Sequence, residues 1–377
     1  MEKTQWEVIV IGAGFVGNFT AKILASRGLN VLVIEEHEQI GTPRHCAGLI
    51  SISGMQRLHL TEIAQKHEVI YNTVRHAIFT GIRGVKRVLT GRRPTAQVVN
   101  RAKLDKVMYQ QAQHAGATYR LGSRVRMLER NGNVHVTFTD GKETVLTGDV
   151  VVDAEGARRT LIQSFPGVDL SHRLPGLQMD IKTKATVVPR NAVELVFNLP
   201  DFFSWIIPLT PRVYRFGLAT RKWGNHLRPL LMKLISDRTP RFEPVRQFGG
   251  LVLTGGPIER FVWGRVIAVG DAAGWVKPTT GGGVVFGGLT AKLAAKAIEE
   301  AIRHQRPLTQ FKKVTKRYRR EFKMMQFARD TLDVLGPYGI ERVLKLLPQP
   351  MFTKLKGDYD LQFKTILKLL FPPLLLF

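Results

Sequence analysis

Cysteine is almost absent from this sequence. Cys46 is the only one in 377 residues, which excludes an internal disulfide and a zinc site built on cysteine pairs. We expect no bound metal, and a chain without disulfides suits a reducing compartment. The opening residues Met1–Glu7 carry no basic segment and lead directly into the apolar run Val8–Ile11. We therefore expect no signal peptide and a cytoplasmic location.

Acidic residues are scarce as well. The chain has 30 Asp and Glu against 56 Lys and Arg, a formal net charge of +26. A field of that sign attracts anionic partners such as nucleic acid, acidic metabolites or an anionic membrane. A generally basic surface without a dedicated partner remains the alternative. Because the sequence contains no recognised nucleic-acid-binding module, we expect no nucleic-acid partner.

Long apolar runs are missing too, and a membrane-spanning helix needs about 20 such residues. The C-terminal stretch 363–377 is nevertheless apolar and cationic, with the sequence FKTILKLLFPPLLLF. A segment of that composition can lie in the membrane interface with its lysines directed towards the headgroups. This pattern predicts peripheral contact with the inner face of the membrane. Packing of the tail on the protein itself, or on a second subunit, stays open.

What the sequence does contain is a strand, helix and strand at its N-terminus. Val8–Ile11 is continuously apolar, as in a strand buried on both faces of a parallel sheet. Apolar residues then recur at helical spacing over 15–24, and Gly28 closes that helix. Val31–Ile34 is the second buried strand. Together they predict a βαβ unit.

A G-x-G-x-x-G motif joins the first strand to the helix, formed by Gly12, Ala13, Gly14 and Gly17. In such motifs the glycines allow a tight turn, close approach of the backbone to a pyrophosphate, and close packing of helix and strand. Glu35 follows the second strand at about the offset expected for a ribose-binding carboxylate. The pattern predicts a dinucleotide site that favours FAD or NAD over NADP.

A second glycine-rich site favours FAD over NAD. The apolar strand at 266–269 ends at Gly270 and Asp271, where a carboxylate can accept hydrogen bonds from ribityl or ribose hydroxyls. A long helix, predicted to end near Arg303, opens directly after Gly281, Gly282 and Gly283. Backbone donors at such an N-terminus can face the pyrimidine edge of a flavin. A nicotinamide-binding domain needs no such second site.

The remaining patterns indicate the domain organisation. We predict an α/β chain in which residues 1–171 and 258–303 form a Rossmann-type FAD-binding domain. Residues 172–257 are rich in strand signals and aromatics and are expected to form an inserted antiparallel β-sheet substrate domain. Residues 304–377 are expected to form a helical C-terminal region with the apolar cationic tail.

Four separated segments together resemble the group 2 flavoproteins typified by the aromatic hydroxylases. They are the glycine motif at 12–17, the R-x-x-[FL]-D pattern from Arg101 to Asp105, the run Asp153–Gly156 and the run Gly270–Gly274. Within that group, three more segments are similar to motifs of the geranylgeranyl reductase family. Its P-x-x-Y-x-W-x-F-P, P-x-T-G-G-G and cysteine-loop motifs are matched by Pro200–Pro208, Pro278–Gly283 and Arg44–Gly48. The resemblance covers roughly residues 6–300.

This resemblance implies a fold, a cofactor and a reaction. Members of the family bind FAD and saturate the C=C bonds of isoprenoid chains with a hydride from the flavin and a proton. The candidate proton donor is Cys46, assisted by His45. The candidate substrate-binding residues are Phe203, Trp205, Ile207 and Pro208. Four residues join the candidate cofactor site: Arg44, Ala47, Arg101 and Asp153.

Two positions depart from the family pattern, which leaves the identity of the isoprenoid open. Phe203 stands where the family usually has Tyr, and Ile207 where it has Phe, so a hydrogen bond from that phenol is absent here. The aromatic segment could equally be the core of a β-domain, and a lone cysteine is often a small buried apolar residue.

Other functions remain open at this stage. An FAD-dependent monooxygenase or halogenase would use the same scaffold, and a flavin-binding protein without turnover is a third possibility. The electron donor of a reductase would be a ferredoxin or NAD(P)H, between which the sequence does not choose.

Overall fold

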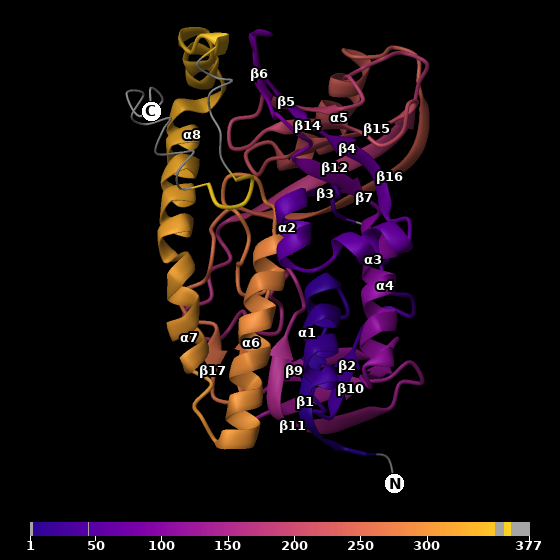
Figure 1. Cartoon of the computed structure of the whole chain (residues 1–377), viewed down its shortest axis with the longest axis vertical. Helices are drawn as coiled ribbons and strands as arrows, with labels where there is room; N and C mark the ends of the chain where they lie inside the picture. Colours follow the sequence, from indigo (N-terminus) through magenta and orange to yellow (C-terminus); the bar gives the residue numbers. More distant parts are fainter. Residues whose placement is uncertain (1–2, 44, 351–357, 363–377) are drawn as a thin grey trace. The chain divides into compact units, whose positions relative to one another are not determined.

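The computed structural model describes residues 3–43, 45–350 and 358–362 (Figure 1). The chain divides into two compact units. The first consists of Met1–Thr42, Arg101–His172 and Gly255–Arg319, and the second of Pro43–Asn100, Arg173–Thr254 and Arg320–Phe377. The fold is mixed α/β, as predicted.

The first unit is built on a mainly parallel sheet in the order β17-β18-β11-β1-β2-β8. Its strands are β1 (Gln5–Ile11), β2 (Val31–Ile34), β8 (Thr118–Arg120), β11 (Glu143–Asp153), β17 (Val262–Trp263) and β18 (Val266–Ala268). The neighbours of β1 are β11 and β2, both parallel to it, and β18 is parallel to β11. Strands β9 (Arg124–Leu128) and β10 (Asn133–Thr137) extend the sheet from β11 in antiparallel fashion. The side chains of Val8, Ile9 and Val10 are fully buried, which explains the unbroken apolar run of β1.

Helix α1 (Phe15–Ser26) follows β1 and packs beside α4 (Arg101–His114) and α6 (Val284–His304) (Figure 1). A buried asparagine joins two of these helices, because the Asn18 amide donates to the carbonyls of Ala13, at 2.7 Å, and Asp105, at 3.3 Å. The long helix predicted after Gly283 is α6. The unit ends with α7 (Gln310–Thr315) and the 3₁₀ turn η2 (Lys316–Tyr318).

The second unit contains a seven-stranded sheet in the order β16-β12-β15-β14-β13-β5-β6. These strands are β5 (His76–Gly81), β6 (Lys86–Thr90), β12 (Arg173–Lys182), β13 (Ala192–Phe197), β14 (Ser204–Pro208), β15 (Val213–Ala219) and β16 (Glu243–Leu253). Every neighbouring pair is antiparallel except β5 with β13. A smaller sheet joins β3 (Leu49–Ser51), β7 (Ala96–Val99) and β4 (Ile70–Val74).

The helices of the second unit are α2 (Ile52–Arg57), α3 (Thr61–Lys66), η1 (Gly224–His226), α5 (Leu227–Ser236) and most of α8 (Arg319–Leu346). Helix α8 is broken at Gly336, whose φ is +58°, and at Pro337, which cannot donate a helical hydrogen bond. In the part of the chain that is described, no helix is both long and apolar enough to cross a membrane.

The compact units differ from the predicted domain boundaries in two respects. Residues 43–100 belong with the large antiparallel sheet, because β5 pairs in register with β13 and β6 pairs with β5. The predicted C-terminal region 304–377 is divided, because residues 304–319 belong with the first unit and the chain from Arg320 belongs with the second. The predicted boundaries followed local sequence patterns, whereas these assignments depend on pairing between segments far apart in the chain.

Candidate functional site: a flavin-binding turn and a cysteine loop

The glycine motif forms the turn between β1 and α1, and its three glycines have different surroundings. A Cβ added at Gly17 would lie 1.9 Å from the Gly12 carbonyl oxygen, and one added at Gly12 would lie 2.5 Å from the Ala154 carbonyl oxygen. These two positions are closed by backbone. At Gly14, in contrast, an added Cβ would meet no described heavy atom within 4 Å. The open position lies at the start of α1, where a phosphate group needs close approach to the backbone.

Glu35 lies at the same turn, because its carboxylate binds the glycine loop directly. One oxygen, Oε2, accepts a hydrogen bond from the Ala13 backbone N–H at 2.7 Å. The other, Oε1, accepts from the His37 backbone N–H at 3.0 Å and lies 2.6 Å from the His37 ring Nδ1. The structure thus places the predicted ribose-binding carboxylate beside the predicted pyrophosphate-binding turn.

The three glycine-rich motifs converge in the first unit. Gly287, in the first turns of α6, would place a Cβ 2.7 Å from Val16 Cγ2 of α1 and 3.4 Å from the Gly270 Cα. The Asp271 carboxylate lies at the start of the same helix, since a Cβ at Gly283 would be 2.4 Å from Asp271 Oδ1. Segments near 12–17, 270–271 and 281–287 therefore meet, as a single cofactor site requires.

Arg159 fixes the Asp271 turn and was missed by the sequence analysis. Its Nε and Nη2 donate to the Asp271 backbone carbonyl at 3.3 and 3.1 Å, and its Nη1 donates to the Asp169 carbonyl at 2.5 Å. The residue is buried and has a φ of +54°. The sequence feature that could have indicated Arg159 is its position three residues after Gly156 of the DAEG run. Lys277, also buried, was missed as well; a Cβ at Gly282 would lie 3.0 Å from its Cε.

Asp153 ends β11 with its side chain fully buried. Its Oδ1 accepts from the Glu155 backbone N–H at 3.1 Å, and its Oδ2 has no hydrogen-bond partner among the described residues. Burial raises the pKa of the Asp153 carboxyl well above its usual range, and the Glu155 carboxylate raises it further. Burial therefore disfavours the charged form of this carboxyl relative to an exposed one. The carboxyl binds the backbone of the segment after β11 through this one hydrogen bond, and contact with a cofactor remains a prediction for this residue.

Of the two arginines predicted to bind the FAD phosphates, the structure describes only Arg101. Arg101 begins α4 and stands beside the first turn of α1, with its guanidinium 5.7 Å from the Phe15 ring centroid and an ion pair to Asp105 at 3.0 Å. This position suits a phosphate-binding role. Arg44 lies outside the described residues.

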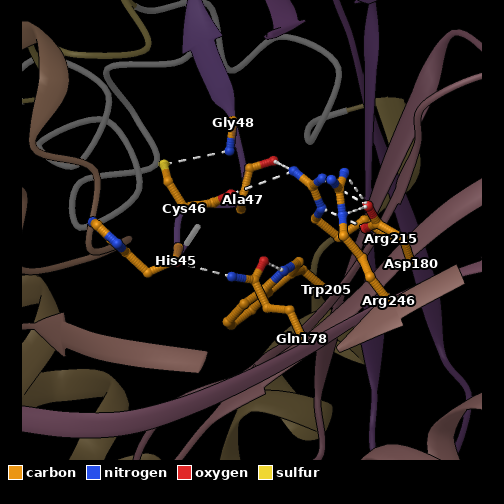
Figure 2. A network of polar contacts seen from close by, with 9 residues as sticks. All are labelled: His45, Cys46, Ala47, Gly48, Gln178, Asp180, Trp205, Arg215 and Arg246. Atoms are coloured by element: carbon orange, nitrogen blue, oxygen red, sulfur yellow. Dashed lines mark hydrogen bonds and ion pairs between the residues drawn. The ribbon is translucent and has the colours of Figure 1, made fainter. Parts of the chain in front are cut away.

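The cysteine loop belongs to the second unit (Figure 2). Cys46 is partly buried, and its Sγ accepts from the Gly48 backbone N–H at 3.4 Å. His45 is exposed, with its ring Nδ1 3.1 Å from the Pro43 carbonyl oxygen. Three successive carbonyls of this loop, those of His45, Cys46 and Ala47, accept hydrogen bonds from side chains of the large sheet. The loop is thus held by its backbone.

The aromatic segment is buried along β14. Phe203, Trp205 and Ile207 point to one face of the sheet and belong to the same apolar cluster, together with Ile340 of α8. The Phe203 ring stacks on Phe202 with centroids 4.1 Å apart and meets Trp205 edge-on at 6.3 Å. Pro208 is buried at the end of the strand. The cluster is a buried apolar core within the second unit, and its contact with a substrate remains a prediction.

Comparison with known proteins also identifies most of the chain as FAD-binding. A family described as "FAD binding domain" matches residues 5–313. Digeranylgeranylglycerophospholipid reductase 2 of Methanothermobacter thermautotrophicus is 29% identical over 364 residues, covering 91% of this chain and 92% of that protein. Digeranylgeranylglycerophospholipid reductase of Methanocaldococcus jannaschii is 28% identical over 312 residues, covering 78% of each.

Two solved structures show the same fold. A geranylgeranyl bacteriochlorophyll reductase-like protein from Thermoplasma acidophilum superposes with a TM-score of 0.87, at 19% identity and with 98% of each chain covered. The myxobacterial chondrochloren halogenase CndH, an FAD-dependent halogenase, has a TM-score of 0.70 at 23% identity, covering 86% of this chain and 82% of that chain. Both likenesses support the predicted fold.

Proposed function

The chain belongs to the FAD binding domain family, and from that premise we propose that it is an FAD-dependent oxidoreductase that saturates C=C bonds of a geranylgeranyl-type isoprenoid. One observation carries the proposal: the three glycine-rich motifs meet in the first unit, where Gly14 leaves open space at the start of α1. Two curated relatives that match most of the chain are named as reductases of digeranylgeranylglycerophospholipids.

The residues of the first unit fit FAD. Backbone N–H groups at the start of α1 would bind the pyrophosphate, and Arg101 nearby would offset its charge. Glu35 and Asp271 would provide carboxylates for ribose and ribityl hydroxyls, and backbone donors of Gly281–Gly283 would bind the flavin. The chemistry that FAD supplies when bound in its reduced form is hydride donation to carbon.

The second unit contains an apolar cluster whose composition suits the proposed substrate class. An isoprenoid alkene carries no charge, so only shape and apolar contact can hold it in place. We assign this role to the cluster around Phe203, Trp205 and Ile207. Saturation also needs a proton on the second carbon. We assign that proton to the thiol of Cys46, a weak acid on a loop held by its backbone.

The substrate class also suggests where the protein works. A phospholipid or prenyl diphosphate is anionic, which suits the net charge of +26. We propose peripheral contact with an anionic membrane through the cationic apolar tail 363–377, which lies outside the described residues. Flotation with vesicles of phosphatidylglycerol and phosphatidylcholine tests this: deletion of 363–377 should move the protein from the vesicle fraction to the soluble fraction. Equal flotation of both proteins would contradict it.

The decisive experiment is anaerobic turnover. Dithionite-reduced enzyme is incubated with digeranylgeranylglycerol phospholipid, and mass spectrometry counts the hydrogen pairs added to the chains. We expect saturated product with wild-type enzyme, and none with free FAD and dithionite or with a Cys46→Ser variant that still binds FAD. Dithionite replaces the natural donor, which we propose to be a ferredoxin or NAD(P)H.

A monooxygenase or halogenase is the second candidate, favoured by the fold shared with CndH. It predicts NAD(P)H consumption that depends on both oxygen and substrate, with a hydroxylated or halogenated product. Such a product, without any saturated one, would replace the reductase assignment.

A further inference from the structure

Arg215 of β15 joins a buried carboxylate to the cysteine loop (Figure 2). Its Nε and Nη2 bind the two oxygens of Asp180 at 2.7 and 3.0 Å. Its remaining nitrogen, Nη1, donates to the Ala47 carbonyl at 2.7 Å and to the Cys46 carbonyl at 3.3 Å. All three nitrogens of a buried guanidinium are therefore engaged, and two of their acceptors are loop carbonyls.

Gln178 holds the preceding carbonyl of the same loop. Its Nε2 donates to the His45 carbonyl at 3.1 Å, and its Oε1 accepts from the Trp205 indole Nε1 at 3.1 Å. In the sheet, Asp180 pairs with Arg215, and Gln178 pairs with Gly217. The side chains that hold the loop therefore project from one face of neighbouring strands.

Gly217 makes the contact between Trp205 and Gln178 possible. Trp205 is on β14 and Gln178 on β12, with β15 between them. Gly217 is the residue of β15 that separates the two, because it pairs with both. A Cβ at this position would lie 2.3 Å from Trp205 Cε2, so only glycine lets the indole cross the strand to its acceptor.

We propose that Arg215 and Gln178 are positioning residues, which hold the Cys46 thiol in place by binding three successive backbone carbonyls of its loop. This inference rests on the proposed function in one respect, the role of Cys46 as proton donor. A loop carbonyl is ordinarily solvated and mobile, whereas a hydrogen bond from a buried guanidinium is among the stronger ones. Misplacing a reacting group by about 1 Å costs on the order of 100-fold in rate, so a fixed loop matters for proton transfer.

The same cluster contains a matched control. Arg246 binds Asp180 Oδ2 through Nε at 2.8 Å and Nη2 at 2.6 Å, and both arginines lie over the Phe248 ring. Arg215→Gln and Arg246→Gln each remove one positive charge from the same carboxylate. Asp180 keeps one guanidinium partner in either variant, so neither leaves that buried carboxylate unpaired. Of these two arginines, only Arg215 binds the cysteine loop in the described contacts.

Hydrogen exchange measured by mass spectrometry on the FAD-loaded enzyme tests the positioning role without turnover. In Arg215→Gln we expect amide exchange in the peptide covering residues 45–49 to be at least about tenfold faster than in wild type, because two of the three held carbonyls are released. In Arg246→Gln exchange of that peptide should match wild type. Unchanged exchange in Arg215→Gln, or an equal increase in both variants, overturns the inference.

Turnover provides the second readout. Arg215→Gln should lower kcat at least about tenfold while KM and FAD content stay within twofold of wild type, and Arg246→Gln should leave all three within twofold. Equal loss of kcat in the two variants, or a change confined to KM, would contradict a positioning role. If Arg215→Gln does not fold, Gln178→Met removes the His45 carbonyl contact, together with the bond from the Trp205 indole. It should increase exchange of the same peptide, and unchanged exchange refutes the inference. If wild-type enzyme reduces no alkene, the proposed function fails, but the exchange comparison still decides whether the loop is held.

Discussion

The guanidinium of Arg159 donates twice to the backbone carbonyl of Asp271, through Nε at 3.3 Å and Nη2 at 3.1 Å. With the bond from Nη1 to the Asp169 carbonyl, it connects the segment after β11 to the turn after β18. Asp271 presents the carboxylate that we assign to FAD hydroxyls. A buried arginine outside the predicted cofactor motifs therefore holds the turn that carries the proposed cofactor-binding carboxylate.

Replacing Arg159 should loosen this turn. In Arg159→Gln the carbonyls of Asp271 and Asp169 lose a charged donor inside the protein, which typically costs about 1–3 kcal/mol of unfolding free energy. We expect a lower urea midpoint and weaker FAD retention on a desalting column. The control is Arg158→Gln, since Arg158 is largely exposed with an ion pair to Glu36 at 3.7 Å and should change stability by about 0.5 kcal/mol or less. Equal effects at the two positions would show that the contacts of Arg159 are unimportant.

The glycine motif allows structural and cofactor roles to be separated. Gly17→Ala places a Cβ 1.9 Å from a backbone carbonyl oxygen, so the turn must deform and the apoprotein itself should be destabilised. Gly14→Ala meets open space within the described structure, so the apoprotein should unfold at nearly the wild-type urea concentration. The added methyl group, however, occupies the place where the pyrophosphate must approach, and FAD affinity measured by fluorescence titration should fall at least about tenfold. A Gly14→Ala variant that binds FAD normally would place the pyrophosphate elsewhere.

Gly217→Ala tests whether the Trp205 indole reaches Gln178 across β15. The new Cβ would lie 2.3 Å from the ring, so the indole must move away and lose its bond to Gln178. We expect a loss of about 1–3 kcal/mol of unfolding free energy, measured by urea denaturation. Gly224→Ala is a suitable control, because its Cβ would make an ordinary contact of 3.4 Å with Pro175 Cγ. If the two variants are equally stable, the ring is not held as described.

Local sequence patterns were sufficient to predict those parts of the fold whose residues lie close together in sequence. The apolar runs of β1 and β2, the glycine turn between them and the start of α6 after Gly283 are all where the sequence placed them. Glu35 was predicted from its offset alone and does lie at the glycine turn. In each case the signal is a residue type at a fixed distance from a strand or helix end.

The parts that were missed depend on contacts between distant segments. Arg159 and Arg215 are two of 56 basic residues. The position of Arg159 after the DAEG run points to the site in general, but no local pattern indicates that either arginine binds backbone carbonyls of distant segments. Burial of Asp153 could not be predicted either, because its motif indicates only that a carboxyl follows a strand. The pairing of β5 with β13 joins residues more than 110 positions apart, which places residues 43–100 in the second unit.

Acid should weaken the attachment of the described C-terminal segment to α2. The Asp358 carboxylate is ion-paired with Arg57 and accepts from the backbone N–H of Asp360 at 2.8 Å and of Leu361 at 3.1 Å. Partial burial raises the pKa of Asp358, but hydrogen bonds from Arg57 and from the two amides, with the Arg57 charge, outweigh burial and leave the pKa below its ordinary value of 3.8.

A carboxyl whose pKa is lower in the folded than in the unfolded state stabilises the fold fully above its unfolded pKa. That contribution is lost as pH falls from about 4 through the folded pKa. We therefore expect Asp358→Asn to lower the unfolding free energy by about 1 kcal/mol at pH 7, and the difference from wild type to shrink as the pH falls below about 4. Urea denaturation of both proteins at a series of pH values measures this. Asp237→Asn, which disrupts an exposed pair with Lys233, should cost about 0.5 kcal/mol or less at pH 7. A difference for Asp358→Asn that stays constant down to pH 2.5 would show that its charge makes no net contribution to stability.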